Sequence, residues 1–208
     1  MAALRRQIEP HTSRQRLLIV CEGKTEETYF SALKSHPNAR KKFHLTVRCP
    51  NPGTGDQLKL VYWANRFYKQ RGKANTFDKV WCIFDLEQPP KQPSFQQAIE
   101  EAGRKNFQVC ASNPCFEVWL LLHFEDISRP YSGSYNAKEE LNARFPNGID
   151  ITDVDWMTRN ICGPDFGGCR KAVERAGRLY DPKLTSVDVA GRNPSTNILS
   201  LVGKLVGM

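Results

Sequence analysis

The chain has no uninterrupted apolar run near the length of about 20 residues that a membrane-spanning helix needs. Its first residues, MAALRRQIEPHTSRQR, lack the apolar block of a secretion signal. It has no C-x-x-C pair, a spacing common in zinc and redox sites, and its seven cysteines are an odd number. We therefore expect a cytoplasmic protein without a membrane partner, with reduced, mostly buried thiols and no zinc site.

Internal repeats and low-complexity tracts are also missing from the 208 residues. Apolar residues make up 40% of the chain and charged residues 25%, which are ordinary values for a folded protein and argue against disorder. The length suits one compact domain, or one core with an added lobe. The E-G-K-T string at residues 22–25 is not a P-loop, because the upstream glycine spacing is absent.

The net charge of +8 is concentrated in the first part of the chain. Residues 1–84 hold 16 of the 30 lysines and arginines and 6 of the 22 acids, a net charge of +10. A polyanion such as nucleic acid would be bound by such a surplus, since neutralised phosphates release counterions. A simple solubility role for the same charges is equally compatible with the sequence.

Apolar runs alternate with helical patterns along the chain, which predicts an α/β fold with a four-stranded, mostly parallel sheet flanked by helices. We expect a flexible basic arm at 1–15, an α/β core at 16–125, and a loop-rich, helical C-terminal extension at 126–208. Asn113 and Pro114 are predicted to begin a buried helix. The expected strands are 16–21, 43–47, 79–84 and 107–112, and the expected helices are 24–35, 57–71, 94–105, 113–123, 137–145, 167–180 and 195–206.

Acidic residues follow two of the predicted strands. Glu22 follows the first, and Asp85 and Glu87 follow the third. Strand ends meet at one edge of a parallel sheet, and residues i and i+2 of an extended segment point to the same side. Carboxylates there are suitable ligands for Mg²⁺ or Mn²⁺, so all three residues are predicted metal ligands and catalytic residues. Acids after strands also cap helices or face solvent, which leaves a second reading open.

Four further residues are candidates for the same site. Glu117 is either a further catalytic acid or a carboxylate that complements the positive end of a helix. Lys24 and Lys59, at the starts of two predicted helices, are expected to bind substrate, although exposed lysines are common. His123 is the third predicted substrate-binding residue, against the alternative of a hydrogen-bonded core histidine.

Four segments of the chain together resemble the RloB-like proteins. The third is the most specific, since N-P-x-F-E-x-W-L-L-x-H-F combines residue types that helix formation alone does not select. The segments are LLIVCEGKTEETYF at 17–30, VWCIFDLEQP at 80–89, ASNPCFEVWLLLHFED at 111–126 and NPSTNILSLV at 193–202.

The resemblance implies a core related to the Toprim domain of topoisomerases, primases and OLD-family nucleases. It further implies an effector of defence against phage that works beside an ABC-type ATPase. Glu22 would then match the Toprim glutamate, and Asp85 with Glu87 the acidic pair, although many Toprim domains have Asp-x-Asp there. The number of metal ions and the oligomeric state stay open.

The predicted function is therefore Mg²⁺-dependent hydrolysis of phosphodiesters in nucleic acid, with RNA such as tRNA slightly favoured over DNA. The alternative is a catalytically idle module that docks on an ATPase or on nucleic acid.

Overall fold

The structure is a computed structural model that describes residues 13–50, 56–71, 76–87, 94–146, 148–163, 167–181, 183 and 185–208. Most of the predicted basic arm, including Arg5 and Arg6, lies outside the described residues. The same holds for most of the loops predicted after the second and third strands.

A mixed α/β fold is built on one five-stranded sheet with the strand order β2-β1-β3-β4-β5. The first four are parallel to their neighbours, and β5 pairs antiparallel with β4. The mostly parallel sheet is as predicted, but the count of four strands was wrong, because a two-residue strand shows no periodicity. The strands are β1 (Gln15–Cys21), β2 (Phe43–Arg48), β3 (Lys79–Asp85), β4 (Gln108–Asn113) and β5 (Ser195–Thr196).

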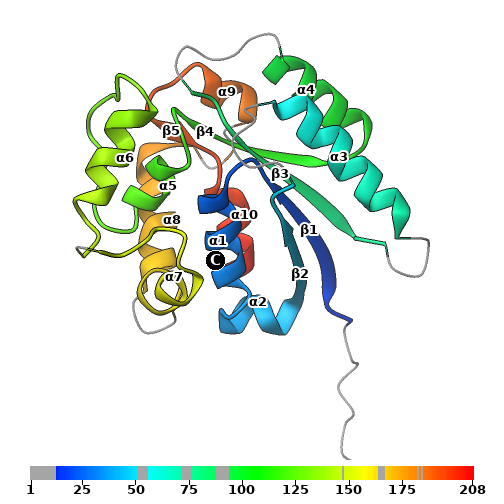
Figure 1. The fold of residues 1–208 in the computed structure, drawn as a ribbon, viewed down its shortest axis with the longest axis horizontal. Helices are drawn as coiled ribbons and strands as arrows, with labels where there is room; N and C mark the ends of the chain where they lie inside the picture. The colour runs from blue at the N-terminus through cyan, green and yellow to red at the C-terminus, as the bar shows by residue number, and fades with distance from the viewer. Residues whose placement is uncertain are drawn as a thin grey trace, which may run out of the picture.

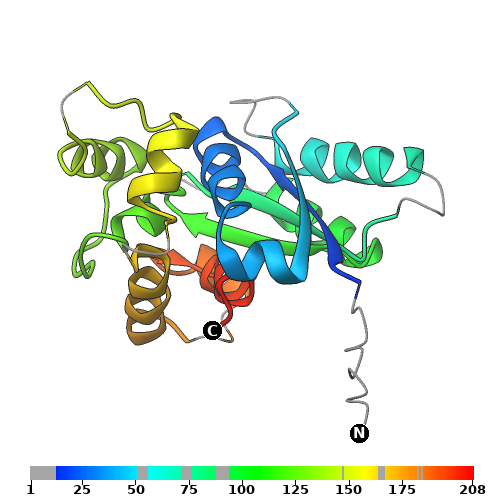
Figure 2. The same ribbon diagram turned by 90° about the horizontal axis from the view of Figure 1, so that it is seen from below.

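Helices cover both faces of this sheet. In Figure 1, α3 and α4 lie side by side on one face, and α1 and α10 lie on the other. Figure 2 shows α8 next to α10, and α7 next to α1. The helices are α1 (Lys24–Leu33), α2 (Pro37–Lys42), α3 (Gln57–Gln70), α4 (Ser94–Arg104), α5 (Glu117–Leu121), α6 (Ser134–Asn142), α7 (Val154–Asn160), α8 (Gly168–Leu179), α9 (Ser186–Ala190) and α10 (Leu199–Val206).

The two central strands are buried on both faces, which explains their unbroken apolar sequences. Leu17 to Cys21 of β1 are fully buried, and so are Cys82 to Phe84 of β3. None of the helices in the described segments is long and apolar enough to span a membrane.

The start of the predicted helix at Asn113 was wrong. β4 continues through Asn113, the Asn113–Pro114 peptide is cis, and α5 begins only at Glu117. Asn113 is not the N-cap of α5, since Phe116 holds that position, and its Nδ2 donates instead to the carbonyl oxygens of Val189 (3.2 Å) and Arg192 (2.6 Å). Hydrogen-bond partners about 75 residues away in the sequence thus determine the conformation of this segment, and local capping patterns cannot reveal such partners.

The short helices α2, α7 and α9 were not predicted, because helices of five to seven residues show less than two turns of periodicity. Asp56 caps α3, because its side chain accepts a hydrogen bond from the Lys59 N–H at 2.9 Å. α10 begins after β5, later than predicted, and packs against α2 and α8.

Candidate functional site

The carboxyl ends of β1 and β3 lie side by side, and they bring Glu22 and Asp85 together as predicted. The parallel register pairs Cys21 with Ile83, so the residues that follow each of them are neighbours. The Asp85 N–H donates a hydrogen bond to Glu22 Oε2 at 3.2 Å. Gln57, at the start of α3, donates from Nε2 to the Asp85 carbonyl at 3.0 Å and fixes that helix to the same edge.

Glu26 is a member of this site that the sequence analysis missed. It lies in the first turn of α1, is only 3% exposed, and accepts a hydrogen bond from the Gly23 N–H at 3.2 Å. A Cβ atom at Gly23 would lie 2.5 Å from Glu26 Oε2, so glycine is needed for the carboxylate to fold back over the chain. Its local sequence gave no signal, because an acid at the third position of a helix is an ordinary capping residue.

Glu117 reaches the same edge from the first turn of α5. Its side chain is buried, with 6% exposed. Within the described part of the chain, Glu117 Oε2 and Asp85 Oδ1 are shielded from solvent and have no hydrogen-bond partner. Such an oxygen is costly to bury, by about 1–3 kcal/mol or more for a charged group, unless something else compensates it.

Glu22, Glu26, Asp85 and Glu117 interact electrostatically, and we call them the acidic cluster. The pKa of Glu26 is raised to about 8, first by burial and then by the charges of Glu117 and Glu22, against backbone hydrogen bonds that lower it. Burial, followed by the charges of Glu26, Glu117 and Glu22, raises the pKa of Asp85 well above its usual value. The structure therefore favours the reading of Glu117 as a member of the site.

Glu87 does not sit as the extended-chain argument predicted. β3 ends at Asp85, and Glu87 is exposed with a φ of 41°, while its N–H donates to the Pro114 carbonyl at 2.7 Å. Leu86, between them, is buried. Because Glu87 has a left-handed backbone conformation, the rule that residues i and i+2 point to the same side does not apply to Asp85 and Glu87. The role of Glu87 as a metal ligand stays a prediction.

Lys138 of α6 is a second residue that the sequence analysis missed. Although burial lowers its pKa, the negative charges of Glu117, Asp85 and Glu87 raise it above the usual value for lysine. A cation therefore lies close enough to Glu117, Asp85 and Glu87 for its charge to interact with theirs. Nothing in its local sequence, which reads as an ordinary helix, distinguishes Lys138.

Lys24 and Lys59 are exposed in the first turns of α1 and α3, two helices that begin at the acidic edge. Each forms an ion pair within its helix, Lys24 with Glu27 at 2.6 Å and Lys59 with Asp56 at 3.0 Å. Exposed pairs of this kind contribute only about 0–1 kcal/mol, so they are easily exchanged for phosphate contacts.

His123 lies in the core, and both of its ring nitrogens are engaged. Nδ1 is 3.2 Å from the Trp119 carbonyl and Nε2 is 3.3 Å from the Tyr29 hydroxyl. The structure thus favours the reading as a hydrogen-bonded core histidine, while its role in substrate binding stays a prediction.

The donor set of the acidic cluster fits a hard divalent cation in its chemistry. Carboxylate oxygens are the ligands that Mg²⁺ and Mn²⁺ prefer, and two of those present are buried without a partner. However, these side chains do not converge on one position. Among the described residues, no group of three or more His, Cys, Asp or Glu side chains is arranged to hold a metal ion.

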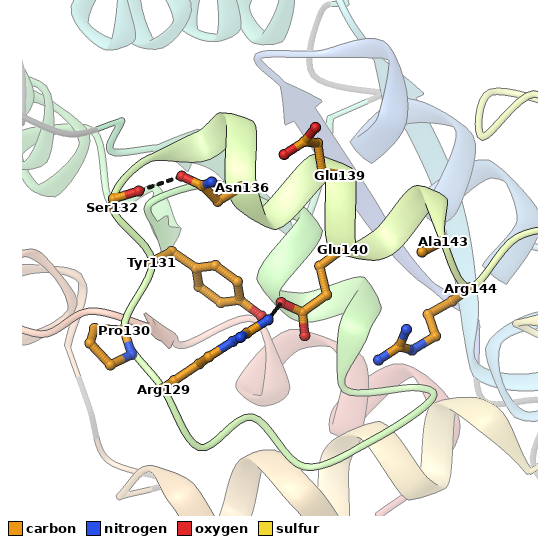
Figure 3. Close-up of a pocket in the computed structure, with 9 residues that line it drawn as sticks. All are labelled: Arg129, Pro130, Tyr131, Ser132, Asn136, Glu139, Glu140, Ala143 and Arg144. Carbon is orange, nitrogen blue, oxygen red and sulfur yellow. Dashed lines mark hydrogen bonds and ion pairs between the residues drawn. The ribbon is translucent and has the colours of Figure 1, made fainter.

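A pocket of about 550 Å³ lies between α6 and the segment that precedes it (Figure 3). Arg129 and Arg144 point toward it, but Arg129 pairs with Glu140 at 2.7 Å and Arg144 pairs with Glu125. Its cations are already neutralised, and the acidic cluster does not line it. We therefore place the candidate site at the acidic edge and not in this pocket.

The fold and this site define a class, that of α/β proteins with buried carboxylates at the carboxyl edge of a mostly parallel sheet. The family model described as "RloB-like protein" matches residues 17–205, and the chain belongs to this family. No curated protein and no solved structure matches it significantly.

Proposed function

We propose that this protein hydrolyses phosphodiester bonds in nucleic acid, with Mg²⁺ or Mn²⁺ held by Glu22 and Asp85, joined by Glu26 and by the predicted ligand Glu87. The observation that carries the proposal is a pair of carboxylate oxygens, Asp85 Oδ1 and Glu117 Oε2, that have no hydrogen-bond partner among the described residues and lie inside a cluster of mutually repelling acids. Buried like charges destabilise a fold, and a cation compensates them. Perturbed acids that converge at a strand edge are typical of functional sites.

Each residue of the site has a defined task under this proposal. Glu22 and Asp85 orient one another through the 3.2 Å hydrogen bond from the Asp85 N–H. Lys138, Lys24 and Lys59 would bind phosphate oxygens around the acids, because each lies on a helix at this edge. A bound ion would supply activation of a water molecule and stabilisation of the developing charge.

The order of these acids supports a Toprim-like organisation of the core. One carboxylate follows β1, another ends β3, and the two strands are adjacent and parallel. The preference for RNA such as tRNA, the role in anti-phage defence in the cytoplasm and the ABC-type ATPase partner are proposals that rest on the family resemblance. Co-purification of the natively expressed protein would test the partner.

The experiment is a cleavage assay on total tRNA, single-stranded RNA and plasmid, with Mg²⁺, Mn²⁺ or EDTA. Wild type should cleave at least one substrate with metal and none with EDTA. Asp85→Asn should be inactive. Glu100→Gln, which changes an exposed acid of α4, should cleave like wild type. Cleavage in EDTA, or full activity of Asp85→Asn, would contradict the proposal.

The alternative is a catalytically idle binding module, and one observation favours it, namely that the described acids are not arranged around a metal position. Such a module would bind nucleic acid without cleaving it in any metal, even in the presence of its co-purified partner. The same assay, run beside a binding measurement, separates the two functions.

A further inference from the structure

Two cysteines lie near each other in a second polar cluster. Cys162 lies just after α7 and Cys169 is the second residue of α8, and both are buried. The Tyr29 hydroxyl lies 3.7 Å from Cys169 Sγ and 3.3 Å from His123 Nε2. A thiol, a phenol and an imidazole are thus in contact within an otherwise apolar interior, with a second thiol nearby.

Hydrogen-bonding contacts bring the two thiols close together. Cys169 Sγ lies 3.7 Å from the Ile161 carbonyl oxygen, which belongs to the peptide directly before Cys162, and Cys162 Sγ lies 3.9 Å from the Tyr29 carbonyl oxygen. This approach depends on Gly168, where a Cβ atom would lie only 2.5 Å from the Ile161 carbonyl oxygen. Because residue 168 is glycine, α8 can begin against the end of α7, which sets Cys169 beside Cys162.

Polar groups gather around the Cys169 sulfur. His123 Nδ1 faces the Trp119 carbonyl oxygen, which can only accept, so this nitrogen carries a hydrogen. The Tyr29 hydroxyl lies 3.3 Å from His123 Nε2 and 3.7 Å from the Cys169 sulfur, and it joins the two. The neighbouring Cys162 thiol, and then His123 and Tyr29, outweigh burial and lower the pKa of Cys169 to about 4.

The other thiols differ from Cys169 in this respect. Burial raises the pKa of Cys110 to about 12. Burial and the charges of Glu27 and Glu26 raise that of Cys49 to about 11, although Cys49 is the only cysteine in the described segments that is partly exposed. The thiolate is the reactive form of cysteine. The low pKa therefore favours Cys169 as the most reactive cysteine, whereas solvent exposure favours Cys49.

Cys169 is only 4% exposed, but it contributes to the lining of a pocket. A pocket of about 250 Å³ has Cys169 in its wall, together with His36, Asn38 and Arg170. Hydrogen peroxide is far smaller than this volume, and a thiolate at a pocket wall is its usual point of attack.

We propose that Cys169 and Cys162 form a peroxide-reactive dithiol site, in which Cys169 is the nucleophile and Cys162 the resolving thiol. The Cys169 thiolate attacks one peroxide oxygen, the O–O bond breaks, and the released hydroxide takes up the proton that the Cys169 thiol gave up and becomes water. The sulfur of Cys162 then attacks the sulfenic acid on Cys169. The S–S bond forms, the S–O bond breaks, and the hydroxyl leaves as water with the Cys162 proton. Two thiols are oxidised and one peroxide is reduced to two waters.

The test treats the native full-length protein with a few equivalents of hydrogen peroxide and then alkylates all remaining thiols with N-ethylmaleimide after denaturation. Trypsin cuts after Arg159 and Arg170, so both cysteines lie on one peptide, NICGPDFGGCR. We expect this peptide to lose two hydrogens and take up no maleimide. The five other cysteines should be alkylated fully, including the more exposed Cys49.

Two variants assign the roles. In Cys162→Ser, oxidation should stop at a sulfenic acid on Cys169 that dimedone captures, and in Cys169→Ser, Cys162 should stay a free thiol. Oxidation of Cys49 before Cys169, or two free thiols on the 160–170 peptide of wild type, would overturn the proposal. The wild-type comparison decides the matter even if a variant fails to fold.

Discussion

Replacement of Glu26 by glutamine should stabilise the metal-free protein at neutral pH. The pKa of Glu26 is raised from its usual 4.5 to about 8, by burial first and then by Glu117 and Glu22. The pKa of Glu26 is higher in the folded protein than in the unfolded one. The contribution of this group to the free energy of unfolding is therefore fully present below about pH 4.5, falls as the pH rises toward 8, and stays constant above pH 8.

The size of the effect follows from the width of that window. At pH 7 the carboxyl group is about 2.5 pH units above its unfolded pKa and still below its folded one, which corresponds to a loss of up to about 3 kcal/mol. Glutamine removes this loss and keeps an oxygen that can accept the Gly23 N–H. For a chain of this size the melting temperature should rise by about 5–10 °C.

The assay is thermal unfolding in EDTA from pH 4.5 to 9, for wild type, Glu26→Gln and the exposed control Glu100→Gln. The difference between Glu26→Gln and wild type should be near zero at pH 4.5 and grow up to about pH 8. The control should follow wild type at every pH. A difference that stays flat or shrinks with rising pH would refute the reasoning.

Three further outcomes are expected. Asp85→Asn should abolish cleavage and leave the melting temperature of the metal-free protein unchanged or higher, since it removes a buried charge without leaving a cavity; a destabilised yet active variant would count against the site. Glu117→Gln should be at least as stable as wild type without metal, but cleave at least tenfold more slowly, about 1.4 kcal/mol in activation free energy. Lys138→Gln should weaken nucleic-acid binding, measured by fluorescence anisotropy, and reduce its salt dependence; unchanged affinity would remove Lys138 from the interface.

The sequence allowed prediction of the sheet and of two members of the site, because both depend on local patterns. Buried strands can be recognised in a sequence by their unbroken apolar residues, and acids that follow neighbouring parallel strands lie close together. Glu22 and Asp85 were predicted on that basis, and their hydrogen bond joins the two strand ends.

Other parts of the site depend on contacts that local patterns do not reveal. Glu26 has the sequence context of an ordinary helix cap, and only its burial beside Glu117 and Asp85 distinguishes it. Lys138 comes to the cluster from a helix more than 50 residues beyond Asp85. The left-handed backbone at Glu87 likewise followed from no local pattern, since such a conformation is uncommon outside glycine and asparagine.

The basic surplus also proved to be spread over both ends of the sheet. Arg40, Lys41 and Lys42 end α2, directly before β2 begins, so they lie at the edge opposite the acids. Strands of six or seven residues separate the two edges by about 20 Å. Charge counted along the sequence therefore indicated a basic protein without indicating where the charges lie.

Binding of Mn²⁺ to the purified protein, measured by isothermal titration calorimetry near pH 7.5, tests the central claim most directly, because it needs neither the substrate nor a partner protein. We predict saturable binding to wild type that is at least tenfold weaker in Asp85→Asn and unchanged in Glu100→Gln. No detectable binding to wild type, or equal binding to Asp85→Asn, would contradict a metal site at the acidic cluster.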